Sequence, residues 1–244
     1  MNFEWPDIVF AQQTVSSNEV WSALAGVLIG GAITFGTSYW FKKREQRIDL
    51  QERDFELYIE LNRVINDVWA IGSRYLPALD KHGWPTAPWS VMQPAIGETN
   101  YSVRIPARLL STIRSKSGKG LTHKALEMAN FRNIIMVANS QFQELHTKVV
   151  EMGAPYADIS QGMRMSADLD ARLPEHKTVI VATERANSLA KQLLKLILDF
   201  YDYAIDFAGH YNTYHSTHKN KVFHKLLIDI SGIQADMSKY STKI

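Results

Sequence analysis

The composition of this 244-residue chain is that of an ordinary globular protein, with 45% hydrophobic and 21% charged residues, enough to bury a single core. The net charge of +2 is unremarkable for the chain as a whole. Cysteine is absent, which excludes a disulfide framework, a thiol nucleophile and a cysteine-ligated zinc site.

The first predicted element is a transmembrane helix over residues 20–41, VWSALAGVLIGGAITFGTSYWF, a stretch without a single charge. At about 1.5 Å per residue it covers roughly 33 Å, enough to cross a hydrocarbon core of about 30 Å. Trp21 at one end and Tyr39 and Trp40 at the other match the aromatic belts of membrane interfaces. A core helix of a soluble protein normally turns one face to water, and a signal peptide needs the basic start that residues 1–19 lack. We therefore expect a retained membrane span.

The sequence after the span, FKKREQR, predicts the orientation of the chain because it carries four cations and one acid. The cations are Lys42, Lys43, Arg44 and Arg47. Positive residues beside a span stay in the cytoplasm, so residues 1–19 form a short extracytoplasmic segment and residues 42–244 a cytoplasmic part of a single-pass cell-membrane protein. We also expect Lys42, Lys43 and Arg44 to bind an anion or anionic lipid.

Small residues recur every fourth position of the predicted span and form one stripe along it. They are Ser22, Gly26, Gly30, Thr34 and Ser38. Gly26 and Gly30 make a GxxxG pair, which lets two membrane helices approach closely. The stripe predicts a homo-oligomer. Two other interpretations remain open: glycine is simply common in membrane helices, or several copies turn the hydroxyl face toward a pore.

Beyond the span, residues 46–76 are predicted to continue as a helix with a coiled-coil-type seam. The seam is Leu57, Leu61, Val64, Val68, Ile71 and Tyr75. It packs either on a second copy or, the slightly favoured interpretation, on later helices of the same chain. A Pro/Trp-rich loop is expected over residues 77–100, where Trp84 and Trp89 either lock the loop onto its own domain or form a partner surface.

Helical periodicity then returns in four stretches, which are residues 105–114, 122–152, 177–215 and 220–238. The second of these has a broad apolar face. It comprises Leu126, Phe131, Ile134, Ile135, Val137, Phe142, Leu145 and Val149. The predicted fold is all-α, with one N-terminal transmembrane helix that continues into a cytoplasmic antiparallel bundle of four or five helices.

A basic segment between Thr99 and Leu126 contains no acidic residue. Its cations are Arg104, Arg108, Arg114, Lys116, Lys119 and Lys124. Arg104 and Arg108 are one helical turn apart and are expected on one face. This charge indicates an anionic partner, such as a lipid headgroup, a nucleotide or a nucleic acid, or a solvated face beside the inner leaflet. The SGKG within it lacks the first glycine of a phosphate-binding loop.

Carboxylates, histidines and aromatic residues gather toward the C-terminus. Asp202, Asp206 and His210 follow one another at one-turn intervals on a helix and could share a metal ion. Tyr211 and Tyr214, with the two tryptophans of the loop, are candidates for a partner surface. The other interpretation of this run is plain packing with solvated polar groups.

No motif pairs a nucleophile with a base. The GxSxG elbow of serine hydrolases and the Arg–His motif of helical-bundle ribonucleases are both absent, so we expect no catalytic residue and no cofactor. The sequence favours a membrane-anchored, self-associating binding or scaffold protein with a cytoplasmic protein partner. An oligomeric effector that permeabilises the bilayer on ligand or partner binding, and a metal-dependent enzyme in the bundle, are the alternatives.

Overall fold

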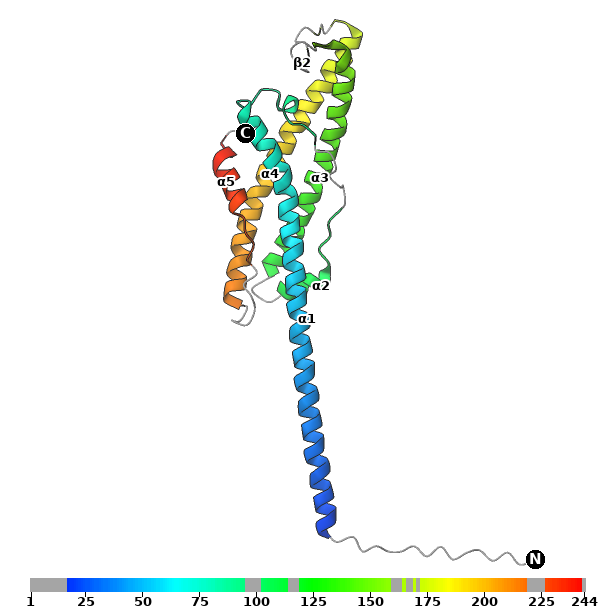
Figure 1. Ribbon diagram of the computed structural model, residues 1–244, viewed down its shortest axis with the longest axis vertical. Coiled ribbons are helices and arrows are strands. Elements are labelled where there is room, and N and C mark those ends of the chain that lie inside the picture. Colours follow the sequence, from blue (N-terminus) through cyan, green and yellow to red (C-terminus); the bar gives the residue numbers. More distant parts are fainter. Residues whose placement is uncertain are drawn as a thin grey trace, which may run out of the picture. The chain divides into compact units, whose positions relative to one another are not determined.

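The computed structural model describes residues 17–94, 102–113, 119–158, 164–165, 169, 172–218 and 227–242. The described residues are helical apart from irregular connections and one antiparallel pair of two-residue strands, which confirms the all-α part of the prediction (Figure 1). The helices are α1 (Ser17–Lys81), α2 (Ala107–Leu110), α3 (Lys119–Gly153), α4 (Pro174–His218) and α5 (Ser231–Tyr240). The strands are β1 (Ala157–Asp158) and β2 (Arg164–Met165).

Two compact units divide the chain, Met1–Leu50 and Gln51–Ile244, and the boundary between them falls inside α1. The described part of the first unit is the beginning of α1. By length and composition this is the one helix among the described residues that could cross a membrane, and none of its most apolar stretch is buried. Its large apolar side chains are exposed, including Val27 at 73% and Phe35 at 75%.

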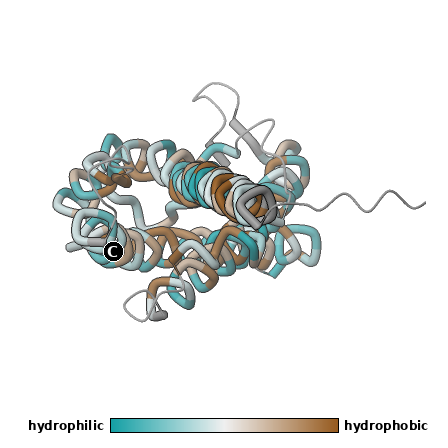
Figure 2. The backbone as a smooth tube through the Cα atoms, turned by 90° about the horizontal axis from the view of Figure 1, so that it is seen from below, coloured by the Kyte–Doolittle hydropathy of each residue, from teal (hydrophilic) through white to brown (hydrophobic). Residues whose placement is uncertain are grey.

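The second unit is built around the antiparallel hairpin of α3 and α4, whose green and yellow-to-orange ribbons lie side by side in Figure 1. Near the start of α3, Lys124 contacts Asp206 toward the end of α4, and Phe131 packs edge-on against Phe200 at 5.7 Å between ring centroids. Hydrophobic and hydrophilic positions alternate along the helices of this unit, as expected of helices with one buried face (Figure 2).

The part of α1 that belongs to the second unit runs parallel to α3, not antiparallel as the predicted bundle implied. Asp67 pairs with Arg132, and eight residues farther along α1 the Tyr75 hydroxyl donates to Asn139 at 2.8 Å, so both residue numbers rise together. The chain returns between these two helices through non-helical segments and the short α2. This irregular connection occupies the place of the descending helix in an antiparallel bundle.

The predicted seam of α1 is the centre of the core. Leu57, Leu61, Val64, Val68, Ile71 and Tyr75 are each at most 1% exposed. They pack with buried residues of α3 and α4, including Phe142, Ile197 and Phe207, in one hydrophobic cluster. The interpretation that this seam serves the chain's own later helices is therefore confirmed, and the seam is not free to pair with a second copy.

The connection between α1 and α3 differs from the predicted loop at its start. Helix α1 continues through Pro77 to Lys81, so the irregular segment begins at His82. A proline inside a helix costs about 3 kcal/mol, but Leu76 and Leu79 on either side are completely buried and hold the last turn in place.

Farther along this connection, Asn133 of α3 holds the backbone of Val103. Its side-chain amide donates to the Val103 carbonyl and accepts from the Val103 N–H, both at 3.0 Å. The Asn133 side chain thereby satisfies the backbone N–H and carbonyl of Val103, which in an extended segment would otherwise pair with a neighbouring strand. The predicted helix over 105–114 is realised only as the single turn of α2 followed by a 3₁₀ turn, Ser111–Ile113.

The apolar face predicted for α3 is only partly buried. Ile135, Phe142 and Val149 lie in the core and Phe131 and Leu145 pack at its edge, whereas Leu126, Ile134 and Val137 are exposed. When apolar residues occur on more than one side of a helix, periodicity alone does not show which side is buried. The neighbouring helices determine that side.

Helix α5 is attached to α1 by several contacts. Gly232 lies against the indole of Trp69, where an added Cβ would be 3.1 Å from the ring. Farther along, Lys239 forms a 2.9 Å ion pair with Asp80. Burial raises the pKa of the Asp236 carboxyl on this helix, although Trp69 donates a hydrogen bond to it. The short last helix is thus held by packing and by specific polar contacts.

Candidate functional site

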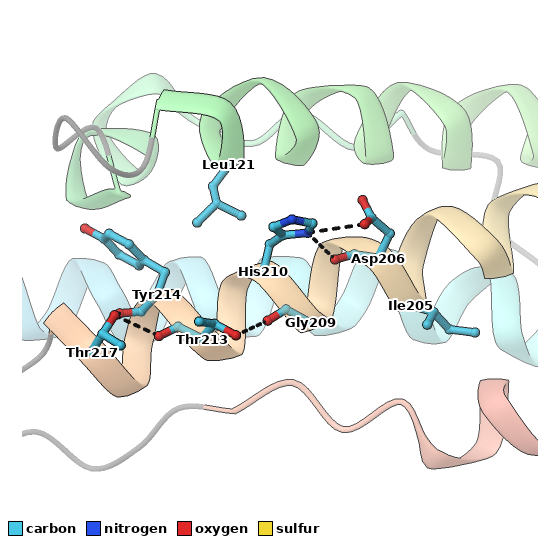
Figure 3. A pocket seen from close by; sticks show the side chains of 8 residues that line it. All are labelled: Leu121, Ile205, Asp206, Gly209, His210, Thr213, Tyr214 and Thr217. Carbon is cyan, nitrogen blue, oxygen red and sulfur yellow. Dashed lines mark hydrogen bonds and ion pairs between the residues drawn. The ribbon is translucent and has the colours of Figure 1, made fainter.

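An open groove of about 530 Å³ lies between the first turns of α3 and the last turns of α4 (Figure 3). Leu121 of α3 faces the groove from one side, and all other lining residues belong to α4. They are Ile205, Asp206, Gly209, His210, Thr213, Tyr214 and Thr217. The spacing along α4 is that of one helix face, so the antiparallel hairpin itself creates the groove.

The most polar end of the groove is an ion-paired cluster. The Lys124 ammonium lies 2.5 Å from Asp206 Oδ2, and His210 Nδ1 lies 3.3 Å from Asp206 Oδ1. The hydrogen bond from Lys124 lowers the pKa of the Asp206 carboxyl. Asp206 is therefore a carboxylate at neutral pH whose charge is already compensated by α3.

The tautomer of His210 follows from its neighbours. Nδ1 is 2.8 Å from the backbone carbonyl oxygen of Asp206, which can only accept, so Nδ1 carries the proton. In the neutral ring Nε2 then carries the lone pair. The dashed lines of Figure 3 show both contacts to Asp206.

The two threonine hydroxyls in the groove donate hydrogen bonds within their own helix. Thr213 donates to the Gly209 carbonyl at 2.8 Å and Thr217 donates to the Thr213 carbonyl at 2.9 Å, so each proton is used within α4. Neither hydroxyl is hydrogen-bonded to His210, and a nucleophile needs such a base. The groove presents oxygen lone pairs, the imidazole of His210 and apolar side chains. This combination is better suited to binding a ligand than to cleaving a bond.

The structure brings together two of the three residues predicted to bind metal. Asp206 and His210 adjoin, but Asp202 does not complete a set with them: no group of three carboxylate or histidine side chains within the described ranges could hold a metal ion. The cation that meets the Asp206 carboxylate is the ammonium of Lys124. The contact between Lys124 and Asp206 is that of an ion pair between two helices.

The predicted aromatic partner surface is largely internal. Tyr211 is completely buried, Tyr214 is 7% exposed and Trp89 is 9% exposed. Trp89 packs on His146 at 5.8 Å between ring centroids, and Trp84 is half-buried against Tyr240 at 5.9 Å. The two tryptophans therefore attach the loop to its own unit. A partner could contact only the exposed parts of Trp84, Trp89 and Tyr214.

Two tyrosines of α4, the buried Tyr211 and the partly buried Tyr203, have raised pKa values. Burial raises the pKa of the Tyr211 hydroxyl, with a further contribution from the nearby Asp54 carboxylate. Tyr203 donates to Glu127 at 2.6 Å, and burial together with this bond raises the pKa of its phenol. Both phenols stay protonated at any physiological pH.

The described cations of the basic segment lie in different surroundings. Arg104 lies in an extended stretch before Pro106, so it does not share a helix face with Arg108, which is the correction to the predicted pair. Arg108 pairs with Glu56 at 3.1 Å and Lys124 with Asp206. Arg114 and Lys116, together with the side chain of Lys119, lie outside the described residues.

In the first unit, Gly26 and Gly30 have no atom within 4 Å of a Cβ added to them. The Thr34 hydroxyl donates to the Gly30 carbonyl at 2.8 Å, so its proton is not offered to a pore. Ser22 and Ser38, the other members of the stripe, are exposed. Lys42, Lys43 and Arg44 are exposed as well.

Two features of the core were not found from the sequence. Arg132, only 1% exposed, donates to Asp67 through Nε at 3.0 Å and Nη2 at 2.6 Å. Gly72 of α1 lies against the hydroxyl and ring of Tyr201 of α4. An arginine between Phe131 and Ile135 in an apolar stretch was the one available signal, and nothing distinguished Gly72.

Comparisons with known proteins add no relative, because no family model, no curated protein and no solved structure matches this chain.

Proposed function

We propose that this chain is a membrane-anchored helical binding protein. Residues 20–41 cross the cell membrane, residues 1–19 lie outside, and the helical unit faces the cytoplasm, where it recruits a protein partner. The proposal rests on one observation: the apolar beginning of α1 is exposed along its whole described length, with Val27, Ile33 and Phe35 all more than 60% exposed. So large an exposed apolar surface indicates a non-aqueous environment.

The hydrophobic core of the second unit does not include this segment. That core draws on α1 only from Leu57 onward, together with the four later helices. An apolar segment that contributes nothing to the core, and that carries no charge over 22 residues, has the properties of a lipid-embedded helix.

We expect the wild-type protein to remain in the membrane fraction after an alkaline carbonate wash, with the intact mass of the full chain. Leu28→Arg/Ile33→Arg should release a large part of it, since each arginine at the centre of a span costs about 2.5–3.5 kcal/mol. The matched control is Ile134→Arg/Val137→Arg, which adds the same charges at exposed positions of α3 and should leave the protein in the membrane.

The absence of cysteine permits a test of orientation without background. An impermeant maleimide should label a Ser16→Cys variant from outside intact cells, but should label Lys148→Cys only after lysis. Release of the wild type by carbonate, or loss of the first residues as a cleaved leader, would contradict the proposal.

We further propose that the spans associate through the small-residue stripe. Because nothing lies within 4 Å of an added Cβ at Gly26 or Gly30, leucine fits at both positions of the single chain. A change in assembly would then report on contact between chains. We expect Gly26→Leu/Gly30→Leu to reduce a defined oligomer to the monomer, measured by light scattering in detergent.

The control for this experiment is Gly31→Leu/Gly36→Leu, which is equally free of contacts but lies off the stripe. It should keep the oligomer of the wild type. Equal masses for all three proteins would show that the glycines only fit the helix to lipid, and the anchored binding domain would remain without self-association through its span.

A further inference from the structure

Several cations of the second unit form ion pairs within the fold. Arg108 pairs with Glu56, Arg132 with Asp67, and Lys239 with Asp80, at distances between 2.6 and 3.1 Å. Lys124 is likewise bound to Asp206. In each of these four pairs the positive charge is compensated by a carboxylate of the same unit.

The cations just after the apolar segment are different. Lys42, Lys43, Arg44 and Arg47 are all exposed, and no carboxylate within the described part of the chain forms an ion pair with any of them. One acid, Glu45, lies among the four. This is the densest uncompensated positive charge in the described structure.

Two of these cations are held against aromatic rings one turn earlier. The Lys43 ammonium lies 5.8 Å from the centroid of Tyr39, and the Arg44 guanidinium lies 5.6 Å from that of Trp40. Side chains on a helix lean toward its N-terminus, so both cations are drawn back toward the apolar segment. Cation–π attraction keeps them there.

The level of the rings is the level of lipid headgroups. Tyr39 and Trp40 are more than half exposed and end the charge-free segment, as interfacial aromatic residues do. A cation held beside such a ring lies where a phosphate of the bilayer lies. A free cation farther along the helix would instead extend into water.

We propose that Tyr39, Trp40, Lys43 and Arg44 form a collar that binds the anionic headgroups of phospholipids in the leaflet at the C-terminal end of the span. This inference rests on the membrane insertion proposed above. The lipid class follows from charge: a headgroup with net negative charge, such as phosphatidylglycerol, is preferred over a zwitterionic one. The two flanking cations, Lys42 and Arg47, add attraction without ring contacts.

The test uses the full chain reconstituted in vesicles of equal parts phosphatidylcholine and phosphatidylglycerol. After extraction in mild detergent, mass spectrometry of the co-purified lipids should show phosphatidylglycerol enriched over the bulk ratio. Lys43→Gln/Arg44→Gln should reduce this enrichment by about fivefold for each cation lost. Lys191→Gln/Lys195→Gln, which removes two exposed cations of α4, should leave the enrichment unchanged.

A third variant, Tyr39→Leu/Trp40→Leu, keeps every charge and removes the rings. It should lose part of the enrichment, because the two cations are no longer held at headgroup level. Full enrichment in this variant would overturn the collar, and so would an equal loss in the α4 control.

Two further outcomes separate this inference from the proposed function. Wild-type protein that resists carbonate but co-purifies with lipids in the bulk ratio overturns the collar alone, whereas protein released from the vesicles by carbonate overturns membrane insertion itself. Loss of the enrichment in inorganic phosphate, but not in chloride of equal ionic strength, would assign the cations to a soluble anion and overturn the lipid assignment.

Discussion

Replacement of Asp67 by alanine is expected to lower the free energy of unfolding by about 3 kcal/mol, because it removes the carboxylate that the buried Arg132 guanidinium binds through two N–H groups. Arg132 is 1% exposed and directs two N–H groups at Asp67 Oδ2, while the Asp67 side chain is 23% exposed and partly screened. With about 2–4 °C per kcal/mol for a chain of this size, the melting temperature should fall by roughly 6–12 °C.

The chain contains a matched control for this experiment. Arg108 and Glu56 form an ion pair of the same chemistry at 3.1 Å, but with both side chains about half exposed or more. Glu56→Ala should cost less than about 1 kcal/mol, since water compensates an exposed guanidinium. Equal effects of Asp67→Ala and Glu56→Ala would show that the Arg132 pair is not effectively buried.

A double variant separates the loss of a partner from the loss of a contact. Arg132→Met/Asp67→Leu removes both charges and keeps apolar volume, so it should be considerably more stable than Asp67→Ala alone. A double variant as unstable as the single one would mean that the pair stabilises the fold through its geometry and not merely by compensating charge.

The parts of the fold that sequence predicted well are those that local periodicity controls. The alternating spacing of four and three residues from Leu57 to Tyr75 places these side chains on one face of α1. Every residue of this seam is in the core. Helix α3 was expected over 122–152 and α4 over 177–215, close to the observed ends at Gly153 and His218. Both helices are long and strongly patterned, which makes them recognisable without tertiary information.

Relations between distant segments were not recoverable in the same way. The parallel course of α1 and α3 depends on a connection whose path is fixed by Asn133 and Val103, thirty residues apart. The ion pairs of Arg108 and Lys124 could not be predicted, because their partners, Glu56 and Asp206, lie 52 and 82 residues away in the sequence. Charge density along a sequence cannot show ion pairs that only folding creates.

The candidate site illustrates the same limit. Asp206 and His210 were expected together because four residues separate them on a helix, and they are in contact. Lys124 belongs to a different helix, and its ammonium changes the cluster from a potential ligand set into an ion pair. Tyr211 and Tyr214 looked like a surface because tyrosine tolerates water, but α4 turns both into the core.

The second large effect is expected at Gly72, where α1 lies against Tyr201 of α4. A Cβ at this position would overlap the Tyr201 hydroxyl oxygen and would lie 2.8 Å from Cζ and 3.0 Å from Ile197 Cγ2. Tyr201 is completely buried and cannot swing into solvent. Gly72→Ala should therefore destabilise the protein by about 2 kcal/mol, although alanine is the better helix former, and lower the melting temperature by roughly 4–8 °C.

The same substitution at Gly209 should act in the opposite direction, because nothing lies within 4 Å of an added Cβ there and alanine gains about 1 kcal/mol in a helix interior. Tyr201→Phe removes the overlapping oxygen at the cost of a long, 3.5 Å hydrogen bond to the Trp69 carbonyl. It should rescue Gly72→Ala in part, since Cζ remains too close. If Gly72→Ala melts as high as Gly209→Ala, the two helices are not in close contact at this point. If it melts lower and Tyr201→Phe gives no rescue, the obstruction is the ring carbon of residue 201 or Ile197, and not the hydroxyl oxygen.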